Sequence, residues 1–154
     1  PRSTPLYSSA ASDVYKRQDK LSSEITLQPI KRFNLDAAII FSDILMLPYG
    51  LGQKVEFKKS FGPLLGNLDI NSISKIDEID FIEKIYPVYK AIKSVSSEMN
   101  SKNKNTIGFV GAPWTLLVYM INQQSPKKIV KKDIFQDNYL INRVLLIIEK
   151  SFNL

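Results

Sequence analysis

The chain has 154 residues, 44% hydrophobic and 23% charged, which is typical of a folded globular protein rather than a disordered one. Its 21 basic and 15 acidic side chains give a formal charge of +6, and it contains no cysteine or histidine. These residues therefore provide no disulfide framework, Ser-His-Asp triad or Cys/His zinc site. We expect carboxylates, hydroxyls, Lys, Arg or Tyr to carry the chemistry, with no metal. The lack of cysteine agrees with a cytoplasmic location.

The basic residues are scattered along the chain. Outside residues 1–18 the only lysine doublets are Lys58-Lys59, Lys127-Lys128 and Lys131-Lys132, and Lys31-Arg32 is one further basic pair. Nucleic-acid binders usually concentrate Lys and Arg on one face. The pattern therefore favours a solvated basic surface and no nucleic-acid partner, although a non-catalytic basic binding module stays an alternative. No segment reaches the ~18 consecutive apolar residues that a membrane span needs.

The two ends of the chain differ from the rest. Residues 1–18 (PRSTPLYSSAASDVYKRQ) show no helical or strand period and resemble a translated adapter. We interpret them as a non-native or disordered tail and assign the fold to residues 19–154. At the other end, Asp137–Phe152 has a helical apolar stripe, which needs a partner surface, and the chain stops without a Gly or Pro. This pattern suggests truncation.

The first half predicts a helix, a strand and a loop. Asp19–Phe33 is a helical pattern in which Pro29 predicts a kink or an early break. Ala37–Phe41 is a continuous apolar run, which is typical of a parallel strand buried on both faces. The glycine- and proline-rich stretch that follows predicts a loop containing a short hairpin, formed by Val55–Phe57 and Pro63–Leu65.

The second half predicts two helices around a strand, and then the last helix. Asp77–Met99 is the longest helical pattern, with Pro87 inside it. Thr106–Val110 predicts a second buried strand, and Trp114–Asn122 predicts a helix that Thr115 caps.

Strands that alternate with long helices predict an α/β fold with a parallel sheet. A complete (β/α)8 TIM barrel needs ~250 residues. We therefore expect a partial (β/α)8 barrel with about two or three of its units.

Two polar residues follow the predicted strands. Asp43 comes just after Ala37–Phe41, and Tyr119 lies about one turn past Thr115. In parallel α/β folds the carboxyl ends of strands face the ligand cleft. Alternatively, Asp43 caps a helical turn at Ile44–Leu47, and Tyr119 is a core aromatic with a satisfied hydroxyl. Spacing alone does not name a reaction.

The same segments resemble the uroporphyrinogen decarboxylase family. The first block reads SEITLQPIKRF and then DAAIIFSDIL, at Ser23–Phe33 and Asp36–Leu45. The second reads GFVGAPWTL with a following Tyr-Met pair, at Gly108–Leu116 and Tyr119–Met120. The resemblance covers about residues 19–154 and corresponds to the N-terminal part of the family, well under half of its length.

The resemblance implies a cytoplasmic barrel, usually a homodimer, which converts uroporphyrinogen III to coproporphyrinogen III by removing four acetate carboxylates. The implied partner is this tetrapyrrole substrate, with no cofactor, no nucleic acid and no membrane. Asp43 matches the catalytic aspartate that accepts hydrogen bonds from the pyrrole N–H groups, and Tyr119 matches the tyrosine near a reacting acetate. Ile39, Phe41 and Phe109 match apolar residues that line the cleft. These three residues, together with Asp43 and Tyr119, are therefore expected to bind the substrate.

Some parts of the family pattern are missing. The RQAGRY-type block, whose arginines bind substrate carboxylates, has no counterpart, because Arg17 stands in the unrelated context YKRQ. The family's later serine and C-terminal histidine would lie beyond Leu154. We therefore expect this chain to be inactive and weakly folded by itself. The alternative enzyme is a related barrel methyltransferase, of the corrinoid or methionine synthase-like kind.

Overall fold

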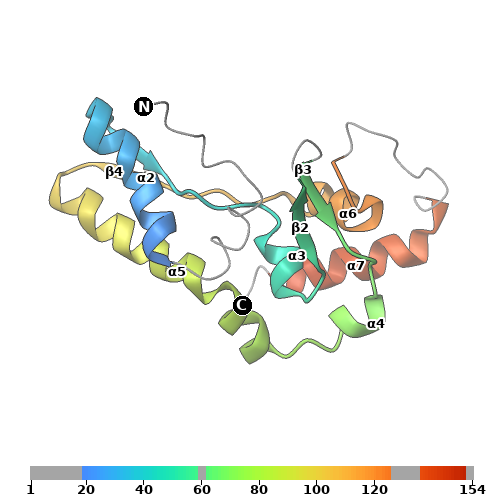
Figure 1. The fold of residues 1–154 in the computed structure, drawn as a ribbon. Helices are drawn as coiled ribbons and strands as arrows, with labels where there is room; N and C mark the ends of the chain where they lie inside the picture. The colour runs from blue at the N-terminus through green and yellow to red at the C-terminus, as the bar shows by residue number, and fades with distance from the viewer. Residues whose placement is uncertain (1–18, 59–61, 126–135, 152–154) are drawn as a thin grey trace. The chain divides into compact units, whose positions relative to one another are not determined.

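The computed structural model describes residues 19–58, 62–125 and 136–151 (Figure 1). Contacts divide these residues into two compact units. We call residues 19–43 with 85–110 the strand-pair unit, and residues 44–84 with 111–151 the hairpin unit. The predicted tail at 1–18 lies outside the described residues.

The strand-pair unit contains two helices and two parallel strands (Figure 1). These elements are α2 (Asp19–Phe33), β1 (Ala37–Ile39), the larger part of α5 (Glu78–Ser101) and β4 (Asn105–Ile107). β1 and β4 pair in parallel with Ile39 opposite Ile107, and beyond the strand end the Ile40 N–H donates to the Ile107 carbonyl at 3.0 Å. The strands and helices thus alternate as the sequence predicted, which makes the fold α/β.

Helices α2 and α5 cover one face of this strand pair. The buried cluster joins residues from both helices to β1: Leu27, Ile30, Ala38, Ile40, Val95 and Met99. Pro29 does not break α2, which continues to Phe33, and α5 likewise continues through Pro87. The early break predicted at Pro29 was therefore wrong.

The predicted strands are shorter than expected and buried on one face only. Ala38 is almost fully buried, whereas Ile39 is 61% exposed and its partner Ile107 is 48% exposed. Alternate residues of a strand point to opposite faces, so Ile39 and Ile107 share the face opposite the helices. Within the described part of this unit no layer covers that face. The prediction of burial on both faces was therefore wrong for this chain.

Glu98 joins α2 to the end of α5. Its carboxylate accepts a hydrogen bond from Lys102 Nζ at 2.8 Å and lies 4.0 Å from Lys31 Nζ. The hydrogen bond from Lys102 lowers the pKa of Glu98 below its usual 4.5, and the charges of Lys102 and Lys31 add to this effect. A carboxyl with a lowered pKa stabilises the fold above its unfolded pKa, and this contribution is lost as the pH falls through the folded pKa.

We therefore expect the protein to be more stable at pH 7 than its Glu98→Gln variant, by at most about 1 kcal/mol because the pair is exposed. The difference should shrink as the pH falls through the folded pKa of Glu98, because the carboxylate is then protonated. Urea unfolding of both proteins, at pH 7 and through the acid range, measures this. A difference that is unchanged in acid would contradict the assigned ion pairs.

The hairpin unit begins with a short helix and an antiparallel hairpin. α3 spans Met46–Gly50, and β2 (Val55–Lys58) pairs with β3 (Gly62–Leu65), which confirms the predicted hairpin. A short helix, α4 (Ile70–Ile73), was not predicted. Its signal is the Asp69 side chain, which accepts hydrogen bonds from the N–H groups of the first turn.

Helices α6 and α7 complete the hairpin unit. α6 spans Pro113–Asn122 and α7 spans Asn138–Ser151. They pack against each other, and their buried apolar side chains are Leu116, Leu117, Met120, Ile121, Ile141, Val144 and Ile148. α6 therefore supplies a partner surface for the predicted α7 stripe, while Phe152 lies outside the described residues. The prediction that Thr115 caps α6 was wrong, because the N-cap is Ala112 and Pro113 opens the helix.

Candidate functional site

The carboxyl edge of the β1–β4 pair gathers the predicted apolar site residues. Ile39 ends β1 on the uncovered face. Phe41 comes two residues after Ile39, and Phe109 comes two residues after Ile107, which is paired with Ile39. Phe109 is 49% exposed. Parallel strands end at the same edge of a sheet, so both phenylalanines follow the strands at that edge. The structure therefore brings Ile39, Phe41 and Phe109 to one edge of the strand pair.

The backbone at Phe41 is bonded to α2. Its carbonyl accepts a hydrogen bond from Ser22 Oγ at 2.7 Å, and its N–H donates to Thr26 Oγ1 at 2.8 Å. Ser22 and Thr26 are four residues apart and so lie on the same side of α2. The predictions did not include these two residues. Serine and threonine at this spacing in an amphipathic helix are the only sequence signal.

Asp43 lies in the same unit, between β1 and α3, and is partly buried. It stands four residues beyond the end of β1, so it follows the strand less directly than the sequence predicted. The N-cap of α3 itself is Leu45, and no side chain caps it. The two predicted roles of Asp43, at the ligand cleft and as a cap of the turn at Ile44–Leu47, stay predictions.

Tyr119 belongs to the hairpin unit, near the end of α6, where it is partly buried. Two contacts fasten this end of α6 to the hairpin. The buried Gln53 amide nitrogen donates to the carbonyls of Met120 and Gly66 at 2.9 Å each, and the Leu65 N–H donates to the Gln123 carbonyl at 2.8 Å. Gln53 thus holds Met120, the residue after Tyr119, by a direct hydrogen bond. No sequence pattern predicted this contact.

Gly111 begins the turn that leads into α6. A Cβ atom on Gly111 would lie 2.8 Å from Leu116 Cδ2 and 3.1 Å from Ile44 Cβ. Leu116 is fully buried, and the Cβ of Ile44 is fixed to its backbone. The glycine of the GAPWTL block is therefore required by close packing within the hairpin unit.

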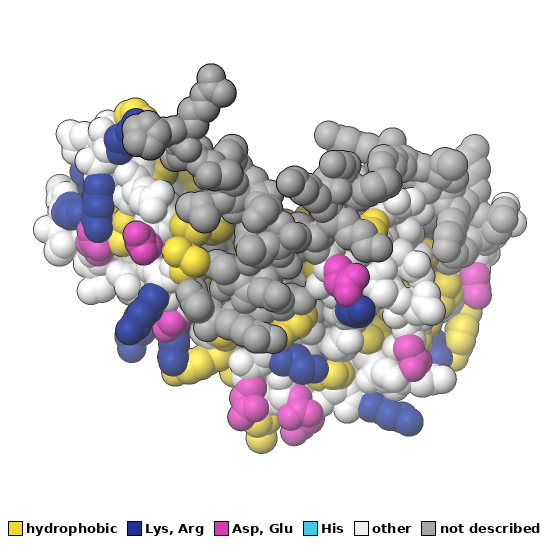
Figure 2. Space-filling view, in the orientation of Figure 1, with side chains coloured by type: hydrophobic (Ala, Val, Ile, Leu, Met, Phe, Trp, Pro, Cys, Tyr) yellow, Lys and Arg dark blue, Asp and Glu magenta, His cyan; other side chains and the backbone are white. Residues whose placement is uncertain are grey.

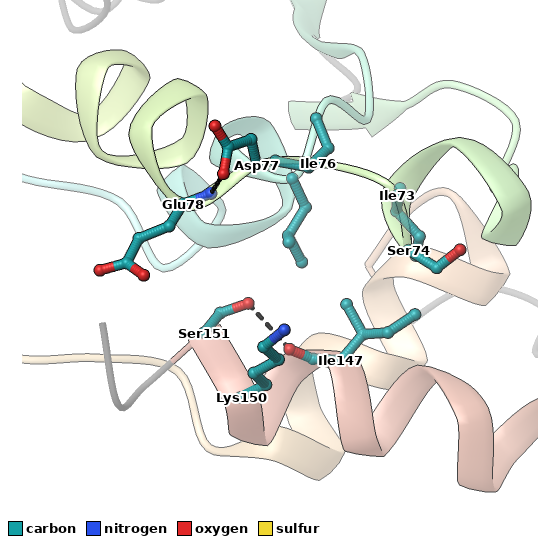
Figure 3. A pocket seen from close by; sticks show the side chains of 9 residues that line it. Ile73, Ser74, Ile76, Asp77, Glu78, Ile147, Lys150 and Ser151 are labelled. Atoms are coloured by element: carbon teal, nitrogen blue, oxygen red, sulfur yellow. Dashed lines mark hydrogen bonds between the residues drawn. The ribbon is translucent and has the colours of Figure 1, made fainter.

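A separate pocket of about 220 Å³ lies in the hairpin unit, between the α4–α5 connection and the end of α7 (Figure 3). Its lining contains none of the predicted site residues. Asp77 and Glu78 contribute carboxylates and α7 contributes Lys150, as Figure 3 shows. Asp77 starts α5, because its carboxylate accepts from the Glu78 N–H at 2.7 Å and its carbonyl from the Phe81 N–H at 3.0 Å. This structural role accounts for Asp77 at the pocket, so no ligand is needed to explain its presence there.

A metal site and a basic nucleic-acid surface have little support in the described residues. Among them, no group of three or more Asp, Glu, His or Cys side chains is placed to hold a metal ion. On the face in Figure 2, basic side chains are spread among acidic ones rather than gathered into one patch. In the part of the chain that the structure describes, no helix is both long and apolar enough to cross a bilayer.

The family can now be assigned. A family model described as "Uroporphyrinogen decarboxylase (URO-D)" matches residues 9–152. The chain belongs to the uroporphyrinogen decarboxylase family. The resemblance that the two sequence blocks indicated is therefore confirmed. The match begins within the predicted tail, so the boundary at residue 18 stays a prediction.

Curated relatives agree with this assignment. The uroporphyrinogen decarboxylase of Rickettsia bellii (strain RML369-C) is 41% identical over 135 residues, which is 86% of this chain and 39% of the relative. That of Neorickettsia sennetsu (strain ATCC VR-367 / Miyayama) is 48% identical over 104 residues, or 66% of this chain and 31% of the relative. The chain thus spans less than two-fifths of the length of these uroporphyrinogen decarboxylases.

One solved structure supports the fold. A methyltransferase from Methanosarcina mazei matches with a TM-score of 0.64 and 17% identity, over 87% of this chain and 40% of the methyltransferase. At such low identity the likeness concerns the fold alone. It gives the methyltransferase alternative no support beyond a shared α/β architecture, whereas the family model and the curated relatives name a decarboxylase.

Proposed function

We propose that this chain supplies part of the substrate cleft of an enzyme that decarboxylates uroporphyrinogen III to coproporphyrinogen III, built on part of a (β/α)8 barrel. The observation that carries the proposal is the edge of the β1–β4 pair. Ile39, Phe41 and Phe109 meet there beside a face that the described residues of the unit leave exposed, and Asp43 follows in the same unit. Apolar surface beside a carboxylate suits a macrocycle with N–H groups at its centre.

The reaction needs a place for the electrons of the broken bond. A proton first adds to a pyrrole carbon next to the one that bears the acetate, which leaves the ring positively charged. The bond to the carboxylate then breaks, CO2 leaves, and the electron pair forms an exocyclic double bond that neutralises the ring. Protonation of the exocyclic carbon and loss of the first proton restore the pyrrole with a methyl group. The substrate is its own electron sink, so the proposal includes no cofactor.

Asp43 has the role of electrostatic stabilisation in this scheme. Its carboxylate would accept hydrogen bonds from the pyrrole N–H groups and stabilise the positive charge that develops on the ring. A carboxylate partly shielded from water by apolar neighbours acts more strongly on such a charge than one in bulk solvent. Asp43 is partly buried, which agrees with this requirement.

Tyr119 has the role of orienting the acetate by a hydrogen bond from its phenol. We expect Tyr119→Phe to retain partial activity, with a rate reduced by no more than about tenfold, because only one orienting contact is lost. Steady-state kinetics of the variant tests this role. Abolished substrate binding in a normally folded variant would contradict it.

The proposal is tested in a hybrid protein, in which residues 19–154 of this chain replace the matching segment of the Rickettsia bellii relative. Uroporphyrinogen III is incubated with the hybrid, and the products are separated by their number of carboxylates. We expect coproporphyrinogen III to accumulate. A folded hybrid that binds the substrate but leaves all its acetates intact would overturn the proposed function.

The partner and location predictions rest on the family resemblance. We infer a homodimer and a cytoplasmic location for the enzyme, and its substrate is the uroporphyrinogen that the relatives' name specifies. Light scattering measures the molar mass of the hybrid in solution and so distinguishes a dimer from a monomer.

A further inference from the structure

Two hydroxyl groups of α2 form hydrogen bonds with the backbone just beyond the end of β1. Thr26 has a single hydroxyl hydrogen, which it donates to the Ser22 carbonyl at 2.8 Å. Its lone pairs are therefore left to accept the Phe41 N–H at 2.8 Å. Ser22 Oγ donates to the Phe41 carbonyl at 2.7 Å, so both backbone polar groups of Phe41 are bonded to neighbouring positions on one helix.

These contacts lie where the parallel ladder ends. The Ile40 N–H still donates to the Ile107 carbonyl of β4, and one residue later the Phe41 N–H donates to α2 instead. Asp43 follows two residues after Phe41. The position of its carboxylate thus depends on a segment that has left the strand and is held from the helix side.

Helix α2, which carries these two hydroxyl groups, is itself packed into the core of the unit. Thr26 is only 4% exposed, and the adjacent Leu27 and Ile30 belong to the buried cluster with Val95 and Met99 of α5. The two hydrogen bonds hold the peptide units on either side of the Phe41 Cα, so this residue is fixed to the anchored helix at both ends.

We propose that Ser22 and Thr26 are positioning residues, which fix the Phe41–Asp43 segment so that the Asp43 carboxylate is held in place for the substrate. This inference rests on the proposed function, because it assigns these residues to the same site. They act through the backbone and touch no reacting atom. Their importance follows from catalysis by preorganised groups, where a misplacement of about 1 Å can cost up to ~100-fold in rate.

The test compares Thr26→Val with two matched variants in the hybrid protein. Valine keeps the shape of threonine but has no hydroxyl, so the Phe41 N–H loses its acceptor. We expect kcat to fall by about tenfold or more with KM changed less than about twofold, because positioning affects the transition state more than ground-state binding. Thr26→Ser keeps the hydroxyl and should restore kcat to within about twofold of the original.

Thr106→Val is the control for the same change of side chain. Thr106 lies in β4 of the same unit, and its buried Oγ1 has no hydrogen-bond partner in the described structure. Its replacement removes a hydroxyl without breaking a hydrogen bond, so kcat should stay unchanged. Equal losses in Thr26→Val and Thr106→Val, or a loss in Thr26→Ser as large as in Thr26→Val, would overturn the positioning role.

Amide hydrogen exchange provides a readout that does not depend on activity. We expect exchange at Phe41 to accelerate at least about tenfold in Thr26→Val, while exchange at Ile40 changes little because its acceptor is in β4. Unchanged exchange at Phe41 would overturn the inference. The two proposals can fail separately. If the unsubstituted hybrid shows no decarboxylation but Thr26→Val gives the expected exchange pattern, the proposed function is refuted, while the hydrogen bonds of α2 to Phe41 are confirmed.

Discussion

Replacing Asp43 by asparagine should lower the rate of decarboxylation by about 100-fold or more in the hybrid protein, on the scale of losing one preorganised electrostatic group. Asparagine has nearly the same shape, so the local packing is preserved. It carries no charge to stabilise a positively charged pyrrole ring. Its NH2 group would also face the pyrrole N–H groups with donors, where the carboxylate offers only acceptors.

The control is Asp36→Asn, the same substitution at the other end of β1. Asp36 is exposed, and its backbone carbonyl rather than its carboxylate accepts the Asn105 N–H at 3.1 Å. We expect its rate to equal that of the unsubstituted hybrid. A rate within threefold of the unsubstituted hybrid for Asp43→Asn would remove the role assigned to Asp43.

Gly111→Ala should destabilise the protein by about 1–3 kcal/mol, the usual cost of an added methyl group in a packed site. The new Cβ would lie 2.8 Å from Leu116 Cδ2 and 3.1 Å from Ile44 Cβ, and both distances are shorter than an ordinary van der Waals contact. Leu116 is fully buried and therefore has little room to move. Urea unfolding of the variant measures the loss.

Gly108→Ala provides the comparison for that substitution. Gly108 belongs to the same sequence block, but a Cβ atom on it would meet nothing within 4 Å. Both changes stiffen the unfolded chain equally, so their difference isolates the clash at Gly111. We expect Gly108→Ala to be at least as stable as the original protein. Equal stability of the two variants would show that the packing around Gly111 tolerates a methyl group.

The elements of the fold follow from local sequence patterns. Apolar periodicity predicted α2, α5, α6 and α7, and the glycine spacing around residues 48–67 predicted the β2–β3 hairpin. The details that failed depend on tertiary contacts. Pro29 was expected to kink α2 or to break it early, yet the helix continues to Phe33 because its apolar side is buried against β1 and α5. Packing of this kind outweighs a local cost, which a pattern of single residues does not reveal.

Site residues that have a sequence motif were predictable, and those that support them were not. Asp43 and Tyr119 stand in the two sequence blocks that carry the family resemblance, and their catalytic roles stay predictions. The contacts of Thr26 and Gln53 connect residues far apart in the chain, Thr26 with Phe41 and Gln53 with Met120. Hydrogen bonds between a side chain and a distant backbone group have no spacing in the sequence from which they could be recognised.

The most direct test of the central claim is the release of CO2 from uroporphyrinogen III labelled in its acetate carboxylates. The hybrid protein and its Asp43→Asn variant are compared at the same concentration of bound substrate. We predict that the hybrid releases the label and forms coproporphyrinogen III, while the variant binds the substrate and releases the label about 100-fold more slowly. Equal rates of release from both proteins, or no release from the folded hybrid with substrate bound, would contradict the assignment of this segment to the catalytic cleft.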